Sequence, residues 1–377
     1  MNDVLNVGGE PVFDDRIVKI KTHTYNPYAN TSFSHSDEIR IPIQQQDVYT
    51  LPSDSYLDVK GKFSLQITAG AVEGSGAVAT AAALTNNCMA FMFDEIRYEL
   101  NGVEIDRNRN SGAGAFNFCV PLCTLLGFCE DYKRVVINAR HELVLIRLRN
   151  DNNSVVASAN SGPTVELHKV QWRMPHVVLN DVNKLKLLRT LESGQYLTMG
   201  FRSCDLYEYP LLQSTSSHSW AVKAATQLEK PRYIIFALQT GRKNVVSRDC
   251  SRFDHCNLSN VKLFLNSDFY PYDDLNLDFG KERYDILYDK YIKFRRSYYG
   301  CDENEALLTL DKFIYCGPLV VIDCSRQNET VKSATVDVRI EFNCKENIPT
   351  DTTAYCLIIH DRIVEYNPLT SVVRRIV

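Results

Sequence analysis

The sequence feature that most constrains the fold is the Asn101-Gly102 pair, which lies between two alternating apolar and polar runs. Both residues tolerate the positive φ angles of a type I′ turn, so the pair predicts a tight β-hairpin. The predicted register places Leu100 opposite Val103. Tyr98 then faces Ile105, which makes one face of the hairpin apolar. Such a face must cover a hydrophobic core, and nothing in the hairpin is typical of a catalytic site.

The other face of the predicted hairpin carries charges. Arg97 is expected to face Asp106, and Glu99 is expected to face Glu104. Like charges directly opposite each other are mildly destabilising, so we expect this face to be solvated. Apolar residues upstream are out of phase with the hairpin, which predicts a β-bulge near Asp94-Glu95.

The composition favours two all-β domains. A chain of 377 residues is too long for one ordinary hydrophobic core. Its 20 tyrosines, 17 phenylalanines and frequent β-branched residues favour sheets. The net charge of −4 argues against a protein that coats nucleic acid, whose basic excess must neutralise phosphates. The 12 cysteines follow no secretion signal and no apolar run could cross a bilayer, so we expect a soluble chain with free thiols in a reducing compartment.

Local patterns divide the chain into four parts. Residues 1–35 contain glycines and prolines with few alternations, and we expect an extended N-terminal arm there. Residues 36–180 and 195–377 are the two predicted strand-rich domains. Between them, residues 181–194 have apolar residues at helical spacing, which predicts a linking helix with Asp181 as its N-cap.

Strands are well marked at both ends of the chain. Residues 39–43 alternate between isoleucine and other residues, and Pro42 favours an edge position because it has no N–H to donate. Residues 57–67 predict a longer strand. Near the C-terminus, residues 355–359 and 363–364 predict two strands joined by a turn.

The second half of the chain repeats the plan of the first, which predicts a duplicated β unit. Three matches occur in the same order: residues 96–102 with 261–267, residues 143–146 with 319–322, and residues 164–167 with 335–338. The halves differ after the second predicted hairpin, where Pro271 should shorten the returning strand. About eight strands per unit is the jelly-roll number, so the predicted fold is all-β, with two tandem eight-stranded jelly rolls, a short linking helix and a few loop helices.

Three segments resemble one known family. Residues 37–47, 93–106 and 362–366 are similar to the double jelly-roll proteins of insect Polinton/Maverick and adintovirus-like elements, a major capsid protein lineage related to adenovirus hexon. The resemblance runs from about residue 10 to the C-terminus. It implies two jelly rolls side by side, three chains in a capsomer of pseudo-sixfold outline, and an icosahedral shell built from such capsomers.

The resemblance also implies partners and a location. The partners would be two further copies of the chain in a homotrimer, neighbouring capsomers, penton or minor capsid proteins and, indirectly, packaged double-stranded DNA, with no small-molecule substrate. The protein would reside in the virion. Two alternatives stay open at this point: a host binding or structural protein derived from a viral element, and a minor capsid component.

Metal-dependent catalysis on a jelly roll needs histidines clustered on neighbouring strands. The eight histidines contain no His-x-His pair and lie at positions 23, 35, 141, 168, 176, 218, 255 and 360. A zinc site at Cys250, His255 and Cys256 would need a second ligand cluster, and loop and core thiols are the favoured interpretation. Cys119, Cys123 and Cys129 lie among leucines and are expected to be buried.

The sequence gives equally little indication of calcium, nucleotide or nucleic-acid binding. Asp268, Asp273, Asp274 and Asp278 lack the register of a calcium loop and predict a polar turn. The glycines at 112 and 114 do not form a nucleotide-binding motif, and no Walker A or nucleophile-elbow motif occurs. The basic and aromatic residues 293–299 and Arg374-Arg375 could contact a genome or an acidic partner, although surface side chains are the favoured interpretation. The sequence therefore predicts no catalytic, cofactor-binding or metal-binding residues, no cofactor and no enzyme activity.

Overall fold

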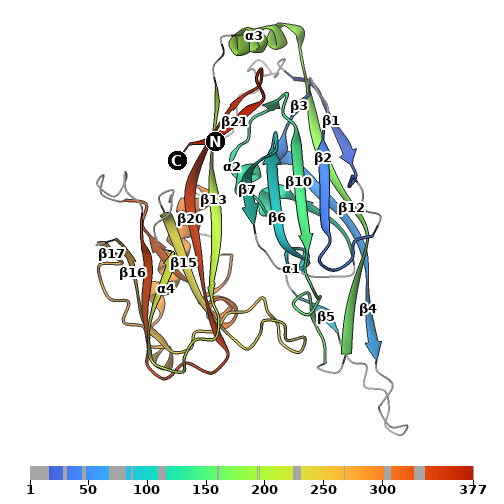
Figure 1. Cartoon of the computed structure of the whole chain (residues 1–377). Helices are drawn as coiled ribbons and strands as arrows, with labels where there is room; N and C mark the ends of the chain where they lie inside the picture. The colour runs from blue at the N-terminus through green and yellow to red at the C-terminus, as the bar shows by residue number, and fades with distance from the viewer. Residues whose placement is uncertain are drawn as a thin grey trace, which may run out of the picture.

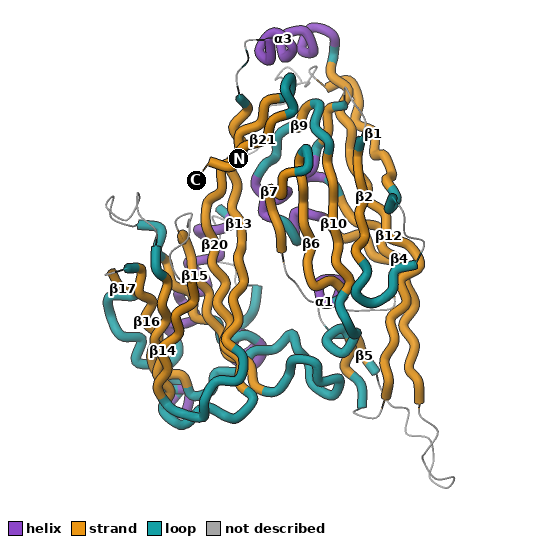
Figure 2. Tube along the Cα trace, viewed as in Figure 1, coloured by secondary structure: helices purple, strands orange, loops and turns teal. Residues whose placement is uncertain are grey.

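The computed structural model describes most of the chain. The described residues are 17–28, 32–44, 48–67, 82–85, 88–108, 116–158, 161–192, 194, 196–223, 231–266, 268–300, 307–326 and 336–376. Within them the secondary structure is mostly β, with few helices (Figures 1 and 2). In Figure 1 the blue-to-green first half lies beside the yellow-to-red second half.

The first half of the chain forms two main sheets. One contains β1 (Ile17–Tyr25), β12 (Ser161–Leu179), β4 (Tyr56–Ile67) and β8 (Phe116–Pro121), extended by β3 (Tyr49–Thr50) and β9 (Val136–Ile137). The other has the order β2 (Glu38–Ile43), β10 (His141–Arg147), β6 (Phe93–Leu100) and β7 (Val103–Asn108). A further small pair joins β5 (Ala83–Leu84) to β11 (Val155–Val156).

The second half forms two sheets on the same plan. One has the order β13 (Leu197–Tyr209), β20 (Thr352–Asn367), β15 (Pro231–Thr240) and β18 (Val320–Asp323), with β21 (Val372–Ile376) also paired to β20. The other has the order β14 (Ser217–Lys223), β19 (Val338–Cys344), β16 (Leu258–Leu265) and β17 (Asp268–Tyr270).

The connectivity of both halves is that of a jelly roll. In the first half the eight main strands are β1, β2, β4, β6, β7, β8, β10 and β12, and in the second half they are β13 to β20. In each half the first, eighth, third and sixth strands share one sheet, and the second, seventh, fourth and fifth share the other. The predicted fold class, two tandem eight-stranded jelly rolls, is therefore confirmed.

Short helices connect the strands. They are α1 (Cys88–Phe91), α2 (Gly127–Asp131), α3 (Asp181–Glu192), α4 (Asp285–Tyr299) and α5 (Leu310–Cys316), with 3-10 turns at η1 (Pro52–Asp54), η2 (Leu122–Thr124) and η3 (Phe279–Lys281). The predicted linking helix is α3, which lies beyond the ends of the sheets in Figure 1. Its N-cap is Asn180, whose Oδ1 accepts a hydrogen bond from the Asn183 amide at 2.8 Å, so the prediction of Asp181 was wrong.

The predicted hairpin is confirmed, but its register is only partly right. Asn101 and Gly102 have φ angles of 50° and 80° and join β6 to β7. Leu100 faces Val103, as predicted. Beyond Glu99 the register shifts, and Tyr98 faces Asp106 because Ile105 is the extra residue of a bulge.

The same shift changes the charged face. Arg97 lies opposite Arg107 and not opposite Asp106, which corrects the predicted pairing. The bulge predicted upstream is confirmed, because β10 pairs Ile146 with Glu95 and Arg147 with Phe93, leaving Asp94 unmatched.

Only one of the three internal matches is structural. The hairpin match is correct, because β16 occupies the place of β6 and returns in β17, which stops before Pro271. The other two matches are wrong. Residues 143–146 lie in β10 whereas 319–322 lie mainly in β18, a strand of the opposite sheet type. The third match compares β12 with the segment leading into β19, and the true counterpart of β12 is β20.

The ends of the chain also differ from expectation. Residues 17–25 of the predicted N-terminal arm form β1, which pairs with β12 and is exposed over most of its length. Residues 1–16 lie outside the described residues. The predicted turn at 360–362 is wrong, because β20 runs through it without a break and pairs with β13 on one side.

Each jelly roll has its own hydrophobic core, but the first core uses residues of the second half. Met199 and Phe201 from β13, with Val364 and Tyr366 from β20, are buried in the same cluster as Tyr98, Phe128 and Trp172. Buried apolar area stabilises a fold by about 25 cal/mol per Å². The two jelly rolls are therefore packed together and not merely tethered by α3.

Candidate functional site

The contact between the two jelly rolls, which we call the seam, contains several buried or half-buried polar side chains. On the first jelly roll it is formed by α2 and β7, and on the second by β13 and β20. The Asp131 carboxylate of α2 accepts bonds from the Arg202 amide at 2.8 Å and from its Nε at 2.7 Å. The Arg202 guanidinium also lies 3.7 Å from the centroid of the Tyr298 ring. Hydrogen bonds from Arg202 to Asp131 raise the pKa of the guanidinium against the effect of burial.

The β7 bulge delivers a carboxylate to the seam. Asp106 is 1% exposed and accepts bonds from the Phe128 amide at 2.8 Å and from the Ser203 hydroxyl at 3.1 Å. Burial raises the pKa of this carboxyl to about 6. Beside it, the Arg362 guanidinium of β20 donates to the Ile105 carbonyl at 3.1 Å.

The chain after β20 returns to the first jelly roll. The Tyr366 hydroxyl shares its one proton between the Ile137 and Asn138 carbonyls, which lie 3.0 and 2.7 Å from its oxygen. The Asn101 side-chain amide at the hairpin tip donates to the Ser371 carbonyl at 3.0 Å. Ser371 thus fixes the C-terminal segment against the first hairpin, and Tyr366 fixes the end of β20 against residues 137 and 138.

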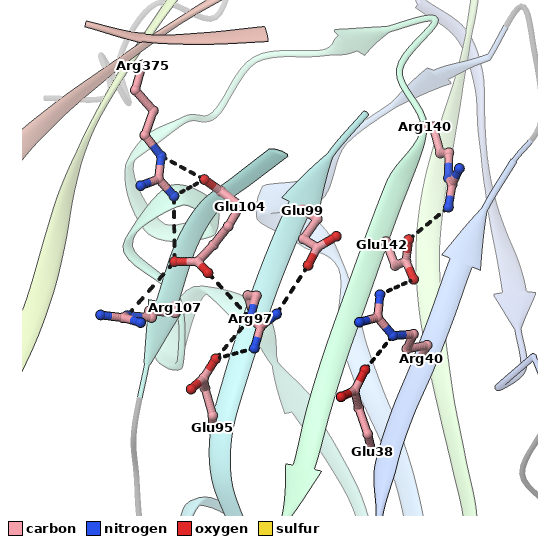
Figure 3. Close-up of polar contacts among 10 residues, drawn as sticks. All are labelled: Glu38, Arg40, Glu95, Arg97, Glu99, Glu104, Arg107, Arg140, Glu142 and Arg375. Atoms are coloured by element: carbon pink, nitrogen blue, oxygen red, sulfur yellow. Dashed lines mark hydrogen bonds and ion pairs between the residues drawn. The ribbon is translucent and has the colours of Figure 1, made fainter. Parts of the chain in front are cut away.

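A charged network covers the outer face of the β2-β10-β6-β7 sheet (Figure 3). Its ten members are five glutamates and five arginines: Glu38, Arg40, Glu95, Arg97, Glu99, Glu104, Arg107, Arg140, Glu142 and Arg375. The network is neutral, and within it basic and acidic side chains alternate across the strands. We call this surface the charged sheet face.

The arginines of the charged sheet face bridge the glutamates. Glu99 does lie opposite Glu104, and Arg97 reaches both at 3.4 Å while holding Glu95 at 2.8 Å. Glu142 binds two arginines in the same way, at 3.0 and 3.1 Å. Glu95, Glu99 and Glu142 are at most 9% exposed, whereas the Arg40 and Arg140 side chains are 45% and 52% exposed, so the predicted solvated face is solvated only in part. The network also extends to the C-terminus, because Arg375 donates to the Glu104 carbonyl at 2.8 Å.

The two hairpins have the same anchoring bonds. Asn101 donates its amide N–H to the Arg140 carbonyl at 2.8 Å, and its side-chain oxygen accepts from the Arg140 amide at 2.7 Å. Asn266 makes the same two bonds to Asp337, at 3.1 and 2.8 Å. Both asparagines have positive φ, 50° and 53°. The turns of the β6–β7 and β16–β17 hairpins are therefore equivalent positions in the two jelly rolls.

A cavity of about 740 Å³ opens at the seam. Its lining includes Asp106, Cys123, Cys129, Cys204 and Tyr298. Burial raises the pKa of the Cys204 thiol to about 12 and that of Cys129 well above its usual value, so both are protonated thiols and poor nucleophiles at neutral pH.

The cysteine predictions are partly right. Cys129 is buried and Cys123 is partly buried, but Cys119 is exposed, contrary to expectation. Cys250 is buried and its thiol donates to the Asn153 carbonyl at 2.9 Å. Cys256 contacts the Thr240 hydroxyl at 3.6 Å. Among the described cysteines, all are free thiols.

The histidines do not converge on one site. Within the described ranges, no group of three His, Cys, Asp or Glu side chains could hold a metal ion. His141 is buried between the Tyr98 and Thr50 hydroxyls, at 2.7 and 2.8 Å. His23 and His176 stack with their ring centroids 4.2 Å apart.

The remaining sequence candidates occupy polar surface or the seam. Asp274 pairs with Lys262 at 2.9 Å, and Asp278 pairs with Lys345 and caps η3. The predicted basic run 293–299 lies at the end of α4, where Tyr298 donates to Glu130 at 2.9 Å. The glycines at 112 and 114 lie outside the described residues.

Sequence reasoning missed the seam and α4. The α4 signal was present, since the buried Leu287 and Tyr291 lie four residues apart. The seam has no local signal, because Asp131 and Arg202 are 71 positions apart. Among the described helices, none is long and apolar enough to span a membrane.

Comparison with solved structures finds the same fold in viral proteins. A chain from the cryo-EM structure of the Sputnik virophage aligns with a TM-score of 0.60 at 8% identity, covering 100% of this chain and 92% of that one. The mavirus major capsid protein aligns with a TM-score of 0.59 at 8% identity, covering 99% and 92%. The Faustovirus major capsid protein aligns with a TM-score of 0.57 at 8% identity, covering 96% and 92%. At these identities the likeness concerns the fold.

Comparison with curated proteins finds no match. The double jelly roll-like domain model matches residues 82–115 and 110–364, which is most of the chain. Together with the repeated strand order, this match shows that the chain belongs to the double jelly roll-like domain family.

Proposed function

We propose that this protein is a major capsid protein that assembles as a homotrimer, each trimer forming one capsomer of an icosahedral viral shell. The observation that carries the proposal is the seam, which packs two jelly rolls of the same strand order side by side. Three such pairs supply six similar units around a threefold axis, and one contact used three times closes the ring. The capsid-protein fold is typically not enzymatic, and the function is structural.

The domain division supports this reading of the chain. We propose that residues 36–180 and 195–377 hold most of the two jelly-roll units and that residues 181–194 link them, with β1 from the predicted arm, residues 1–35, adding the first strand of the first unit. The pairing of β1 with β12 supports a position of that arm along the first jelly roll. We also propose that the protein comes from a Polinton/Maverick or adintovirus-like element, on the strength of residues 37–47, 93–106 and 362–366.

A protein that builds an icosahedral shell must bind other shell proteins. They would be two further copies in the trimer, neighbouring capsomers, penton or minor capsid proteins and, indirectly, packaged double-stranded DNA, with the protein located in the virion. The chain's net charge of −4 supports an indirect contact with DNA, because direct coating would require a basic excess.

Light scattering coupled to size-exclusion chromatography tests the proposal. The expected species has three times the 43.0 kDa chain mass, and negative-stain images should show a roughly hexagonal face. A monomer at all concentrations, or a closed dimer, would contradict it.

A further inference from the structure

Helix α3 presents an apolar stripe that is exposed in the described part of the chain. Val182, Leu185 and Leu188 are 61%, 56% and 39% exposed, and they follow one another at intervals of three residues on one side of the helix. Lys184 and Arg189 are exposed beside them. We call these five residues the α3 face. Exposed apolar residues gathered on one helix are typical of an interaction site.

A second exposed surface has the opposite character. The edge of the second jelly roll at β17 carries Phe269 and Tyr272, which are 36% and 83% exposed and stack with their ring centroids 5.2 Å apart. Asp268 and Asp273 are exposed beside them. We call these four residues the β17 edge. It is aromatic and carries two carboxylates, although Lys262 lies 4.9 Å from the Phe269 ring. The α3 face is aliphatic and carries two cations, with Asp181 and Glu192 exposed at the ends of the helix.

The fold relates these two surfaces to a contact that is already made inside the chain. In the first jelly roll, the hairpin that corresponds to β16–β17 is β6–β7, since Asn101 and Asn266 have the same anchoring bonds. The segment that follows the last strand of the second jelly roll lies on that hairpin, through Ser371 and Arg375. In the first jelly roll, the segment that follows the last strand is α3.

If the two hairpins are equivalent, each should be covered by the segment that follows the last strand of a neighbouring jelly roll. The hairpin of the first jelly roll is covered by the C-terminal segment of the second. The corresponding cover for the β17 edge would be the α3 segment of a first jelly roll. The α3 of the same chain lies between β12 and β13 in chain order, and in Figure 1 it is at the top of the molecule, away from β17 at the outer edge of the second jelly roll.

We propose that the α3 face is a docking surface for the β17 edge of a second copy of this chain. The contact is heterologous, so each copy offers its α3 face to one neighbour and its β17 edge to the other, and a threefold ring closes. The Val182, Leu185 and Leu188 side chains pack on Phe269 and Tyr272. Lys184 and Arg189 face Asp268 and Asp273, in the way that Arg375 faces Glu104 within the chain. This inference rests on the proposed trimer and names the residues that hold it.

Substitutions at the two surfaces test the contact by light scattering over a dilution series. Leu185→Asp and, separately, Tyr272→Ala should each raise the concentration at which the trimer dissociates by at least about tenfold, because each removes a central apolar anchor. Leu211→Asp is the matched control, since Leu211 is 72% exposed but lies on the connection between β13 and β14. It should leave the trimer unchanged.

A charge exchange tests the pairing itself. Lys184→Glu and Asp273→Lys should each weaken the trimer, and the double variant should recover most of the loss. Lys312→Glu, on the exposed surface of α5, is the control for a change in net charge. A double variant no stronger than the weaker single variant would overturn the pairing.

Cross-linking of the unmodified protein gives a measurement that does not depend on folding of a variant. Chains labelled with ¹⁴N and ¹⁵N are mixed at low concentration, concentrated, and treated with a carbodiimide, which joins an amine to a carboxylate. The expected product links an α3 peptide to a peptide containing Asp268 or Asp273, with mixed labels.

The outcomes separate the two proposals. If the wild-type protein is a trimer but Leu185→Asp and Tyr272→Ala dissociate as the wild type does, or if no mixed cross-link forms, the docking contact is wrong and the capsid function stands. If the wild-type protein never forms a trimer, both are wrong.

Discussion

The Arg202 guanidinium and the Asp131 carboxylate join the two jelly rolls by a two-point ion pair, in which Nε donates to Oδ2 at 2.7 Å and a terminal amino group reaches Oδ1. The side chains are 16% and 20% exposed, so the pair is largely shielded from water. Arg202 also donates to the Tyr298 carbonyl at 2.5 Å, which ties α4 to the same point.

Removing one partner should therefore destabilise the protein. We expect Arg202→Met or Asp131→Asn to lower the free energy of unfolding by about 2–4 kcal/mol, because the remaining group loses its partner in a poorly hydrated place. Equilibrium urea unfolding measures the change. Arg232→Met is the control, since its pair with Asp361 is 45% and 61% exposed and should cost less than about 1 kcal/mol. Equal losses for both variants would contradict the role given to the seam.

Gly127 lies directly against the backbone of the second jelly roll. A Cβ atom there would overlap with the Arg202 carbonyl, which is backbone and cannot turn away. We expect Gly127→Ala to cost about 3 kcal/mol by forcing α2 away from β13. Gly200→Ala, on β13 itself, is the matched control because a Cβ there meets nothing within 4 Å. A Gly127→Ala variant as stable as Gly200→Ala, in thermal or urea unfolding, would show that the seam is looser than described.

Two variants of Asn101 separate the backbone and side-chain contributions of the hairpin turn to the free energy of unfolding. Asn101→Ala should cost about 2–4 kcal/mol, because alanine is strained at φ 50° and two side-chain hydrogen bonds are lost. Asn101→Gly tolerates the positive φ and should cost only about half as much. Urea unfolding of both variants decides the point, and a glycine variant that loses as much as the alanine variant would exclude the strain argument.

Arg147 and Asp151 form a fully buried ion pair inside the first jelly roll. Their side chains are 0% and 1% exposed and lie 2.6 Å apart, and Asp151 also accepts from the Val165 amide at 2.9 Å. We expect Asp151→Ala to lower the free energy of unfolding by about 3–5 kcal/mol, since it leaves a buried guanidinium without its carboxylate. The test is the urea midpoint, and a loss below about 1 kcal/mol would contradict the prediction.

His176 should make stability depend on pH. Burial and the neighbouring His23 lower its folded-state pKa from 6.5 to about 4, so the unfolded state binds the proton first as the pH falls. Stability from this residue is present above about pH 6.5 and decreases between pH 6.5 and 4. Because partial hydration reduces the effect, we expect a loss of about 1–2 kcal/mol at pH 4.5.

The measurement compares His176→Gln with the wild type by urea unfolding at pH 7 and 4.5. The variant should lose less stability on acidification. Asp106 acts in the opposite sense, because its folded-state pKa is raised to about 6 and its contribution grows as the pH falls towards 3.8. It is present in both proteins, so the difference between them reports His176 together with its effect on the neighbouring His141, whose pKa is lowered by burial and by His176. Parallel pH profiles would contradict the assignment.

What could be predicted from the sequence was local. Asn101-Gly102 encodes its own turn, and the isoleucines of β2 encode their alternation and, with Pro42, an edge strand. The position of Asp106 could not be predicted, because the bulge that buries it is stabilised by Phe128 and Ser203, which come from other elements.

Contacts between residues far apart in the sequence could not be predicted from local patterns of apolar and polar residues. Short apolar runs such as 319–322 resemble many strands, so two of the three matches paired strands of opposite sheet types. Glu99 and Glu104 do oppose each other, but the low exposure of Glu99 depends on the folded position of Arg97. Partners such as Arg202 and Asp131 are set by tertiary packing, and no spacing in the sequence indicates them.

The burial of Met199, Phe201, Val364 and Tyr366 in the first core has a consequence for synthesis. The first jelly roll is synthesised before residues 364 and 366, so its hydrophobic core cannot be completed until the second half of the chain has been made. A product that ends before residue 364 lacks two of these buried side chains, so we expect it to expose apolar surface and to be degraded.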